Sequence, residues 1–304
     1  MEYVHLNNGM EMPILGFGTM RVKNLPELIP EVIRTGYRLI DTAANYDNER
    51  EVGEGIRRAV SEGIVKREEL FITSKMQILS DGAKNTPIAV ENSLKNLGLD
   101  YIDLYLIHQP YGDLYGEWRA LEKLQKKGKI RAIGVSNFEP FRLMDLMLHN
   151  EVKPAVNQIE VNPWCQMTAE HQFNTENDII TEAWSPLAEN KNDLFENDNL
   201  KKLAGKYGKN VQQVILRWVT QRGIVAIPRT SSVEHAVANF DIFDFSLTDA
   251  EMEQIGSLDT GKTTALDHLD PEVVKLLSTV VANPIEAGNK RPSHDEWAAQ
   301  RGLK

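Results

Sequence analysis

Four residues with complementary chemistry lie at the ends of short apolar runs, or shortly after one, in the first part of the chain. Asp41 ends the run RLID, Tyr46 comes five residues later, Lys75 ends LFITSK, and His108 ends IDLYLIH. An ammonium group lowers the pKa of a nearby phenol from its ordinary value of about 10, and a carboxylate can hold that ammonium in place. An imidazole can hydrogen-bond a carbonyl oxygen. Together these groups predict a proton donor beside a polarised carbonyl, which suits carbonyl reduction by a nicotinamide cofactor.

Each residue taken singly has a structural explanation as well. Asp41 could cap a turn or helix, and Tyr46 could be a half-buried packing residue. The elements expected around them favour the chemical interpretation. Apolar, strand-like runs end at Thr19, Asp41, Lys75, His108, Ser136, Gln158, Trp184 and Pro228. Amphipathic, helix-like stretches lie between them, among them residues 48–63, 86–98 and 116–129, the last with Gly128 as its expected C-cap.

This alternation predicts an α/β fold, a (β/α)8 TIM barrel formed as a single domain by residues 1–304. An Asn-Gly turn predicts an N-terminal β-hairpin. Residues from about 260 to 304 are less periodic and are expected to form a C-terminal loop and tail near the barrel mouth, in which the stretch ANPIEAGNKRPSHDEW is expected to be irregular. Active sites of such barrels lie at the C-terminal ends of the strands, so Asp41, Lys75 and His108 are expected to meet at one mouth.

Composition narrows the class of protein. The net charge of −10 argues against sequence-independent binding to nucleic acid. Cys165 is the single cysteine, which excludes an intrachain disulfide and a multi-cysteine zinc site. No apolar run approaches the roughly 18 residues that span a membrane, and the first residues lack a signal-peptide pattern. We expect a cytoplasmic enzyme with no metal, membrane or nucleic-acid partner, acting as a monomer or weak dimer on a small carbonyl substrate.

A phosphate-binding site is expected at two loops. GFGTM lacks the third glycine of a dinucleotide fingerprint, and GEGIRR lies inside a helical pattern. A barrel can instead bind phosphate through the loops after its seventh and eighth strands, which read AWSPLAEN and AIPRTSS. Ser185, Arg229, Thr230 and Ser231 are therefore candidate phosphate ligands, and the planar guanidinium of Arg229 suits this role.

The chain resembles the aldo-keto reductase family over nearly its whole length, and in particular bacterial members that reduce 2,5-diketo-D-gluconate or methylglyoxal. The segments that carry the resemblance, in the family's order and spacing, are IDTAANYDNE, ITSK, DLYLIH, GKIRAIGVSNF, VNQIEVNP and WSPL. The resemblance implies a catalytic tetrad in which Tyr46 is the general acid, with Asp41, Lys75 and His108. It also implies a nicotinamide site in which Ser136, Asn137 and Gln158 hold the carboxamide and Trp184 stacks on the ring. Further cofactor contacts are implied for Leu187 and Asn239.

Departures from the family bear on the cofactor. Trp184 stands where the family usually has tyrosine, and the larger indole should still stack on the nicotinamide ring. Arg229 and Thr230 replace a lysine and a serine, so the charge that would bind an adenosine 2′-phosphate is kept. His235 replaces an arginine near the adenine, and it adds positive charge only when protonated. The expected cofactor is NADPH, with NADH possible as a second donor.

The expected substrate pocket is polar. Family members that act on bulky apolar carbonyls often have tryptophans at this mouth, whereas this chain has Met20, Gln77 and Gln109 at positions that look equivalent. Tyr111 and Trp164 are further candidates for the pocket lining. Amide groups favour small polar substrates such as methylglyoxal, a keto-sugar acid or a short aldehyde. The alternative is that Gln77 and Gln109 point to solvent at the rim.

Two other functions are compatible with parts of the pattern. Lys75 at a strand end could serve as the Schiff-base nucleophile of a lyase, although Asp41 would keep it charged. The chain could also be a non-catalytic nicotinamide-binding or interaction protein on the same barrel. Cys165 is expected to be a packed small residue. Surface or loop positions are expected for His149, His171, His268 and His294.

Overall fold

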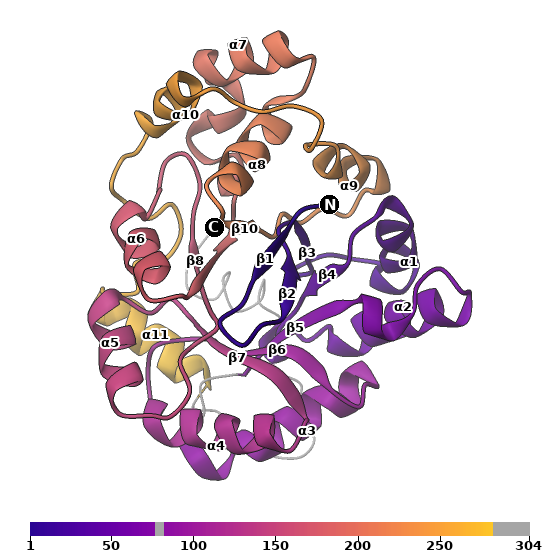
Figure 1. The fold of residues 1–304 in the computed structure, drawn as a ribbon, viewed down its shortest axis with the longest axis vertical. Coiled ribbons are helices and arrows are strands. Elements are labelled where there is room, and N and C mark those ends of the chain that lie inside the picture. Colours follow the sequence, from indigo (N-terminus) through magenta and orange to yellow (C-terminus); the bar gives the residue numbers. More distant parts are fainter. Residues whose placement is uncertain (77–81, 282–304) are drawn as a thin grey trace.

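The computed structural model describes residues 1–76 and 82–281, and its core is a barrel of eight parallel strands (Figure 1). The strands follow one another around the barrel in sequence order: β3 (Gly16–Gly18), β4 (Leu39–Asp41), β5 (Phe71–Met76), β6 (Ile102–Ile107), β7 (Ile130–Ser136), β8 (Val156–Glu160), β9 (Ile180–Trp184) and β10 (Val225–Ala226). The barrel closes where Leu15 bridges to Ala226 and the Gly18 N–H donates to the Pro228 carbonyl at 3.0 Å. The predicted TIM barrel is confirmed, and the strand ends lie within two residues of those expected.

Helices surround the barrel (Figure 1). They are α1 (Leu25–Thr35), α2 (Glu49–Ser61), α3 (Thr86–Leu97), α4 (Leu114–Lys126), α5 (Pro140–Leu148), α6 (Thr168–Glu176), α7 (Asp198–Tyr207), α8 (Val211–Gln221), α9 (Val233–Phe240), α10 (Asp249–Gly256) and α11 (Pro271–Val281). The 3-10 helices are η1 (Ala44–Tyr46), η2 (Arg67–Glu69), η3 (Gly82–Lys84) and η4 (Ala188–Glu196). Helices α2, α3 and α4 confirm the three amphipathic stretches, and Gly128 follows α4 with a left-handed φ of 73°.

Two apolar layers explain why the strands read as continuous hydrophobic runs. Alternate strand residues such as Leu39, Leu104 and Leu106 fill the barrel interior, while Ile40 and Tyr105 pack outward against the helices. A strand between these layers is buried on both faces, so it needs no polar alternation. Gly134 of β7 allows a close approach here, because a Cβ atom on it would lie 2.6 Å from the Val156 carbonyl oxygen of β8.

The N-terminal hairpin fills one end of the barrel. Strands β1 (Tyr3–His5) and β2 (Glu11–Pro13) pair antiparallel, which confirms the hairpin predicted from the Asn-Gly turn. Figure 1 shows the hairpin across the centre of the strand ring. Leu6 and Met12 are buried and join the interior apolar cluster with Leu39. The functional strand ends therefore face the opposite end of the barrel.

The segment after α10 returns to that opposite end. Thr260 N–H donates to the Trp164 carbonyl at 2.9 Å, and Thr264 N–H donates to Oε1 of buried Glu160 at 3.0 Å. This confirms a C-terminal loop near the barrel mouth. Within the expected loop and tail, residues 271–281 form the helix α11, which was not predicted from the sequence. The stretch ANPIEAGNKRPSHDEW lies outside the described residues, as does His294. Among the described helices, none is long and apolar enough to cross a membrane.

Candidate active site

The four residues of the expected tetrad converge at the barrel mouth. Lys75 of β5 donates from Nζ to Oδ1 of Asp41 at 2.6 Å and to the hydroxyl of Tyr46 at 3.2 Å. Its third bond goes to the Thr42 carbonyl at 2.9 Å. The Tyr46 and His108 rings meet edge to face with centroids 5.8 Å apart. Three neighbouring strands therefore bring a carboxylate, an ammonium and an imidazole to one phenol.

The loop that carries Tyr46 is fixed by a buried asparagine. Asn48 is 7% exposed, donates from Nδ2 to the Thr19 carbonyl at 2.8 Å, and accepts from the Thr42 hydroxyl at 2.8 Å. In the loop between Thr42 and Asn48, η1 ends at Tyr46, and Asp47 takes a left-handed φ of 60°. Sequence reasoning did not identify Asn48 as a positioning residue, because a polar residue before a helix is usually explained as a cap.

Burial and charge set the protonation of the tetrad. Burial lowers the pKa of Lys75, but Asp41, Tyr46 and Glu182 together raise it well above its ordinary value. Burial raises the pKa of Asp41, and Lys75 and Gln158 offset part of that rise. The pKa of His108 lies well below its ordinary value because the ring is desolvated and Lys75 is near. At neutral pH the site therefore holds an ammonium and a neutral imidazole.

The pKa of Tyr46 is raised in this structure, although Lys75 acts on it in the predicted direction. Lys75 does lower that pKa, but burial of the phenol raises it by more, and Asp41 and Glu182 add to the rise. The phenol therefore stays protonated at neutral pH. The spacing of residues could indicate the neighbouring ammonium but not the desolvation of the phenol.

A second group of side chains adjoins the tetrad. Ser136 ends β7 and donates to the Gln158 carbonyl at 2.8 Å, and Asn137 Nδ2 donates to the Ser136 hydroxyl at 3.1 Å. The Trp184 indole N–H donates to Asn137 Oδ1 at 2.9 Å. Gln158 Nε2 donates to Asp41 Oδ2 at 3.0 Å. Hydrogen bonds thus join the four residues of the expected nicotinamide site to one another and to Asp41.

Comparison with known proteins gives the family. The aldo/keto reductase family model matches residues 14–260. This chain belongs to the aldo/keto reductases.

Characterised relatives and solved structures agree with this assignment. Glyoxal reductase of Bacillus subtilis is 47% identical over 261 residues, which cover 84% of this chain and 92% of the relative. Methylglyoxal reductase DkgA of Escherichia coli is 41% identical over 269 residues, covering 87% and 96%. A Bombyx mori aldo-keto reductase solved in complex with NADP superposes with a TM-score of 0.84 at 33% identity, covering 88% of this chain and 95% of that one. The chain is thus an oxidoreductase by family.

The expected phosphate ligands of this aldo/keto reductase follow β9 and β10. Ser185 directly after β9 has a left-handed φ of 52°, and Leu187 is half-buried before η4. Arg229 is 35% exposed and pairs with Glu189 of η4. The Thr230 hydroxyl accepts from the Ser232 N–H, so it fixes the start of α9. Within this set Ser231 and His235 are exposed, whereas Asn239 is buried.

The residues expected to line the substrate pocket differ in how close they lie to the other site residues. Gln109 is half-buried, and its Oε1 accepts from Asn137 at 3.4 Å, so it adjoins the second group of side chains. Tyr111 donates to the His268 carbonyl at 2.7 Å. The Trp164 indole N–H donates to the Lys191 carbonyl at 3.1 Å, and Met20 is half-buried after β3. Gln77 lies outside the described residues.

His268 faces the site, although it was interpreted as a surface or loop residue. Its ring meets the Trp184 ring at 6.3 Å and 69°, and burial lowers its pKa. The interpretation is wrong as to the surface, because the loop folds back over the mouth. His171 is also half-buried and contacts the Thr181 hydroxyl at 3.0 Å, whereas His149 lies on the surface. The sequence holds no local signal for contacts of such long range.

Two further residues of the mouth were not identified from sequence. Glu160 is 2% exposed and accepts hydrogen bonds from Thr263, Thr264 and Asn162. Glu182 is fully buried and accepts from Gln158 Nε2 at 2.7 Å. Both lie on strands at alternating positions with expected site residues. That periodicity could have marked them as inward-facing, since strand residues two apart share a face.

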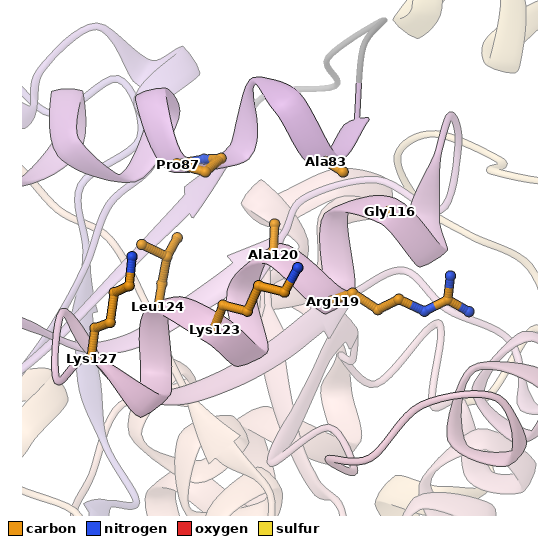
Figure 2. Close-up of a pocket in the computed structure, with 8 residues that line it drawn as sticks. All are labelled: Ala83, Pro87, Gly116, Arg119, Ala120, Lys123, Leu124 and Lys127. Carbon is orange, nitrogen blue, oxygen red and sulfur yellow. The ribbon is translucent and has the colours of Figure 1, made fainter.

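Other features lie away from the tetrad. A surface groove of about 350 Å³ runs between α4 and the segment carrying Ala83 and Pro87, and Figure 2 shows Arg119, Lys123 and Lys127 beside it. Burial raises the pKa of the Cys165 thiol to about 12, which fits a packed residue. Among the described residues, no three His, Cys, Asp or Glu side chains form a metal-binding group.

Proposed function

We propose that this chain reduces aldehyde and ketone carbonyls to alcohols with NADPH, and that Tyr46 is the general acid. The observation that carries the proposal is the buried Lys75 ammonium bonded to both Asp41 and the Tyr46 hydroxyl. When bound, NADPH supplies the hydride that adds to the carbonyl carbon. The carbonyl π electrons then move to the oxygen, which takes the Tyr46 proton.

Each member of the tetrad has a distinct part. The raised pKa of Tyr46 keeps the proton on the phenol until an oxygen anion develops next to it. The phenolate that remains lies 3.2 Å from Lys75, whose charge stabilises it. Asp41 holds Lys75 charged and in place. His108 is neutral, so a ring N–H can donate to the carbonyl oxygen and orient it.

The side chains of the second group fit a nicotinamide. With both N–H bonds of Gln158 directed to carboxyl groups, its Oε1 is the atom left to accept from a carboxamide. Ser136, Asn137 and Trp184 complete this group. At the other end, the exposed cation Arg229 suits a 2′-phosphate, which favours NADPH over NADH. The Bombyx mori structure in complex with NADP is consistent with this assignment.

The substrate class is inferred from the polar mouth. Gln109, Tyr111 and His268 bring an amide, a phenol and an imidazole toward it, and all three are half-buried. Two relatives are named for glyoxal and methylglyoxal, which are small polar dicarbonyls. We therefore infer that short, polar carbonyls are turned over better than long alkyl or steroid ketones.

The test follows NADPH absorbance with methylglyoxal, a keto-sugar acid and an aromatic aldehyde. Tyr46→Phe should keep cofactor binding and lose about 10²–10⁴-fold in kcat, the usual contribution of a general acid. Tyr3→Phe is the matched control, since that phenol is 48% exposed at the other end of the barrel. Equal turnover by wild type and Tyr46→Phe would refute the mechanism. Cofactor binding without reduction of any carbonyl would favour a non-catalytic role.

The Schiff-base alternative is disfavoured by the state of Lys75. The amine is fully buried, is bonded to Asp41, and has a raised pKa, so it is an ammonium and not a nucleophile. Borohydride treatment with a carbonyl substrate should leave Lys75 unmodified. A trapped adduct on Lys75 would revive the lyase assignment.

A further inference from the structure

A buried carboxyl on the far wall of the barrel is connected to the tetrad. Gln158 of β8 donates through Nε2 to Asp41 Oδ2 at 3.0 Å and to Glu182 Oε2 at 2.7 Å. Asp41 in turn contacts Lys75, and Lys75 contacts Tyr46. A continuous hydrogen-bonded chain thus runs from the Tyr46 hydroxyl to Glu182. One end, Tyr46, lies on η1 just after β4, and the other end, Glu182, lies on β9, so the chain crosses the barrel interior.

We propose that Glu182 is a positioning residue of this reductase: it fixes the face that Gln158 turns to the cofactor and couples its own ionisation to the acid strength of Tyr46. This inference rests on the proposed function and extends it to a residue outside the tetrad. The amide of Gln158 can satisfy two acceptor carboxyls only with its nitrogen toward them. Without Glu182 the amide would keep one anchor and could turn.

Charge balance requires the cluster to hold a proton. The groups that face Glu182 are Asp41 from β4, Lys75 from β5 and Tyr46 from η1, while β10 brings the apolar Val225 beside it. Two buried carboxyls share one ammonium, so ionising both would leave an uncompensated buried charge.

Glu182 is the group that keeps the proton. Burial and then Asp41 raise the pKa of Glu182 to about 8, against smaller opposing effects of Gln158 and Lys75. Its Oε1 is buried and has no hydrogen-bond partner within the part of the chain that the structure describes, and the same is true of the Thr73 hydroxyl. An ionised oxygen without a donor would be costly to bury, whereas a neutral carboxyl is less so.

The consequence for catalysis has a definite sign. When Glu182 loses its proton, its negative charge raises the pKa of Tyr46, so the phenol becomes a weaker acid. Reduction should therefore slow as the pH rises through about 8, where Glu182 ionises. A neutral replacement at this position should shift that alkaline decline to higher pH.

Three variants separate the two parts of the proposal. Glu182→Gln keeps the shape and an acceptor for Gln158 but cannot ionise. Glu182→Leu removes the acceptor. Thr181→Val is the matched control on the same strand, because its hydroxyl contacts His171 and Asn174 on the other side of the sheet.

The measurements are pH profiles of kcat/KM and the KM for NADPH. Glu182→Gln should move the alkaline limb up by about one pH unit or more at unchanged KM for NADPH. Glu182→Leu should raise that KM about tenfold, since Gln158 loses a fixed orientation. Thr181→Val should follow wild type in both. A Glu182→Gln profile that superimposes on that of wild type, or a Glu182→Leu variant with normal KM, would overturn the corresponding part.

A readout without turnover keeps this inference separate from the proposed function. Infrared difference spectra of wild type should show a protonated carboxyl band that disappears as the pH rises through about 8 and that is missing from Glu182→Gln. If wild type reduces no carbonyl but the band titrates in this way, the proposed function is refuted, while the protonated state of Glu182 is supported. If carbonyls are reduced and no such band exists, the coupling of Glu182 to Tyr46 is refuted and the proposed function is not affected.

Discussion

The two halves of the mouth differ in how firmly their charges are held. On the side of β4 to β6, Lys75 is fully buried and bonded to Asp41, and Asn48 fixes the loop carrying Tyr46. On the side of β9 and β10, Arg229 is 35% exposed and pairs with Glu189 of η4. Five consecutive residues of η4, from Glu189 to Asp193, have non-helical dihedrals, and four of these have positive φ. The ion pair of the proposed catalytic residues is thus buried, while the expected phosphate contacts lie on an exposed, irregular segment.

The largest expected effect comes from removing the buried cation. Lys75→Met should abolish reduction and lower the free energy of unfolding by about 3–5 kcal/mol, because Asp41 is left as an uncompensated buried charge. Chemical denaturation measures this loss. Lys126→Met is the matched control, since its pair with Glu151 is largely exposed and its loss should change stability little. Similar losses in both variants would contradict the contrast between sealed and exposed charges.

The same variant gives a pH test with a fixed sign. Without Lys75, the folded-state pKa of Asp41 should rise further above its unfolded value of about 3.9. A group with a raised folded-state pKa stabilises the fold below its unfolded pKa, and this contribution is lost as the pH rises through the folded-state pKa. The stability gap between Lys75→Met and wild type should therefore narrow as the pH falls toward 4. A gap that widens on acidification would argue against Asp41 as the cause.

A smaller effect is expected from loosening the Tyr46 loop. Asn48→Ala removes the bonds to the Thr19 carbonyl and the Thr42 hydroxyl, which should cost about 1–3 kcal/mol in unfolding free energy. Since Tyr46 loses its fixed position, kcat should fall about tenfold or more, with little change in KM. Asn177→Ala is the control, because that amide makes a similar bond to the Phe173 carbonyl on α6. Unchanged kcat in Asn48→Ala would show that the loop needs no such anchor.

The smallest effect concerns the exposed half. Glu189→Gln frees Arg229 from its carboxylate, so NADPH should bind a few-fold more tightly, in keeping with an exposed pair worth at most about 1 kcal/mol. NADH affinity should hardly change, and added salt should reduce the difference. Glu196→Gln is the control in the same segment, where its partner is Lys201. Weaker NADPH binding would instead show that Glu189 helps to hold the segment over the nucleotide.

The sequence predicted the barrel and the meeting of the tetrad for one physical reason. Parallel strands of a barrel end in a common ring, so polar residues at the ends of β4, β5 and β6 had to be neighbours. Local patterns could not show how far each side chain is from water. The sequence therefore indicated the lowering effect of Lys75 on the pKa of Tyr46 but not the larger, opposing effect of burial.

The features that sequence reasoning missed depend on distant segments. His268 reaches Trp184 because residues from 257 onward fold back to the mouth, with Thr264 bonded to Glu160. Glu182 joins the site through a hydrogen bond from Gln158 on the neighbouring strand. Helix α11 was missed because the chain after about Asp259 shows little periodicity as a whole. Contacts of this kind depend on how segments distant in the sequence pack together, which no short sequence motif predicts.

The N-terminal hairpin closes one end of the barrel and so leaves the opposite end as the route to the site. Strands β1 and β2 place Leu6 and Met12 in the barrel interior, so that end is filled by side chains in the described part of the chain. Everything that reaches Lys75 and Tyr46 therefore enters and leaves by the ring of strand C-termini. Because both reactants use the same entrance, the one that binds deeper in the barrel must bind first and dissociate last.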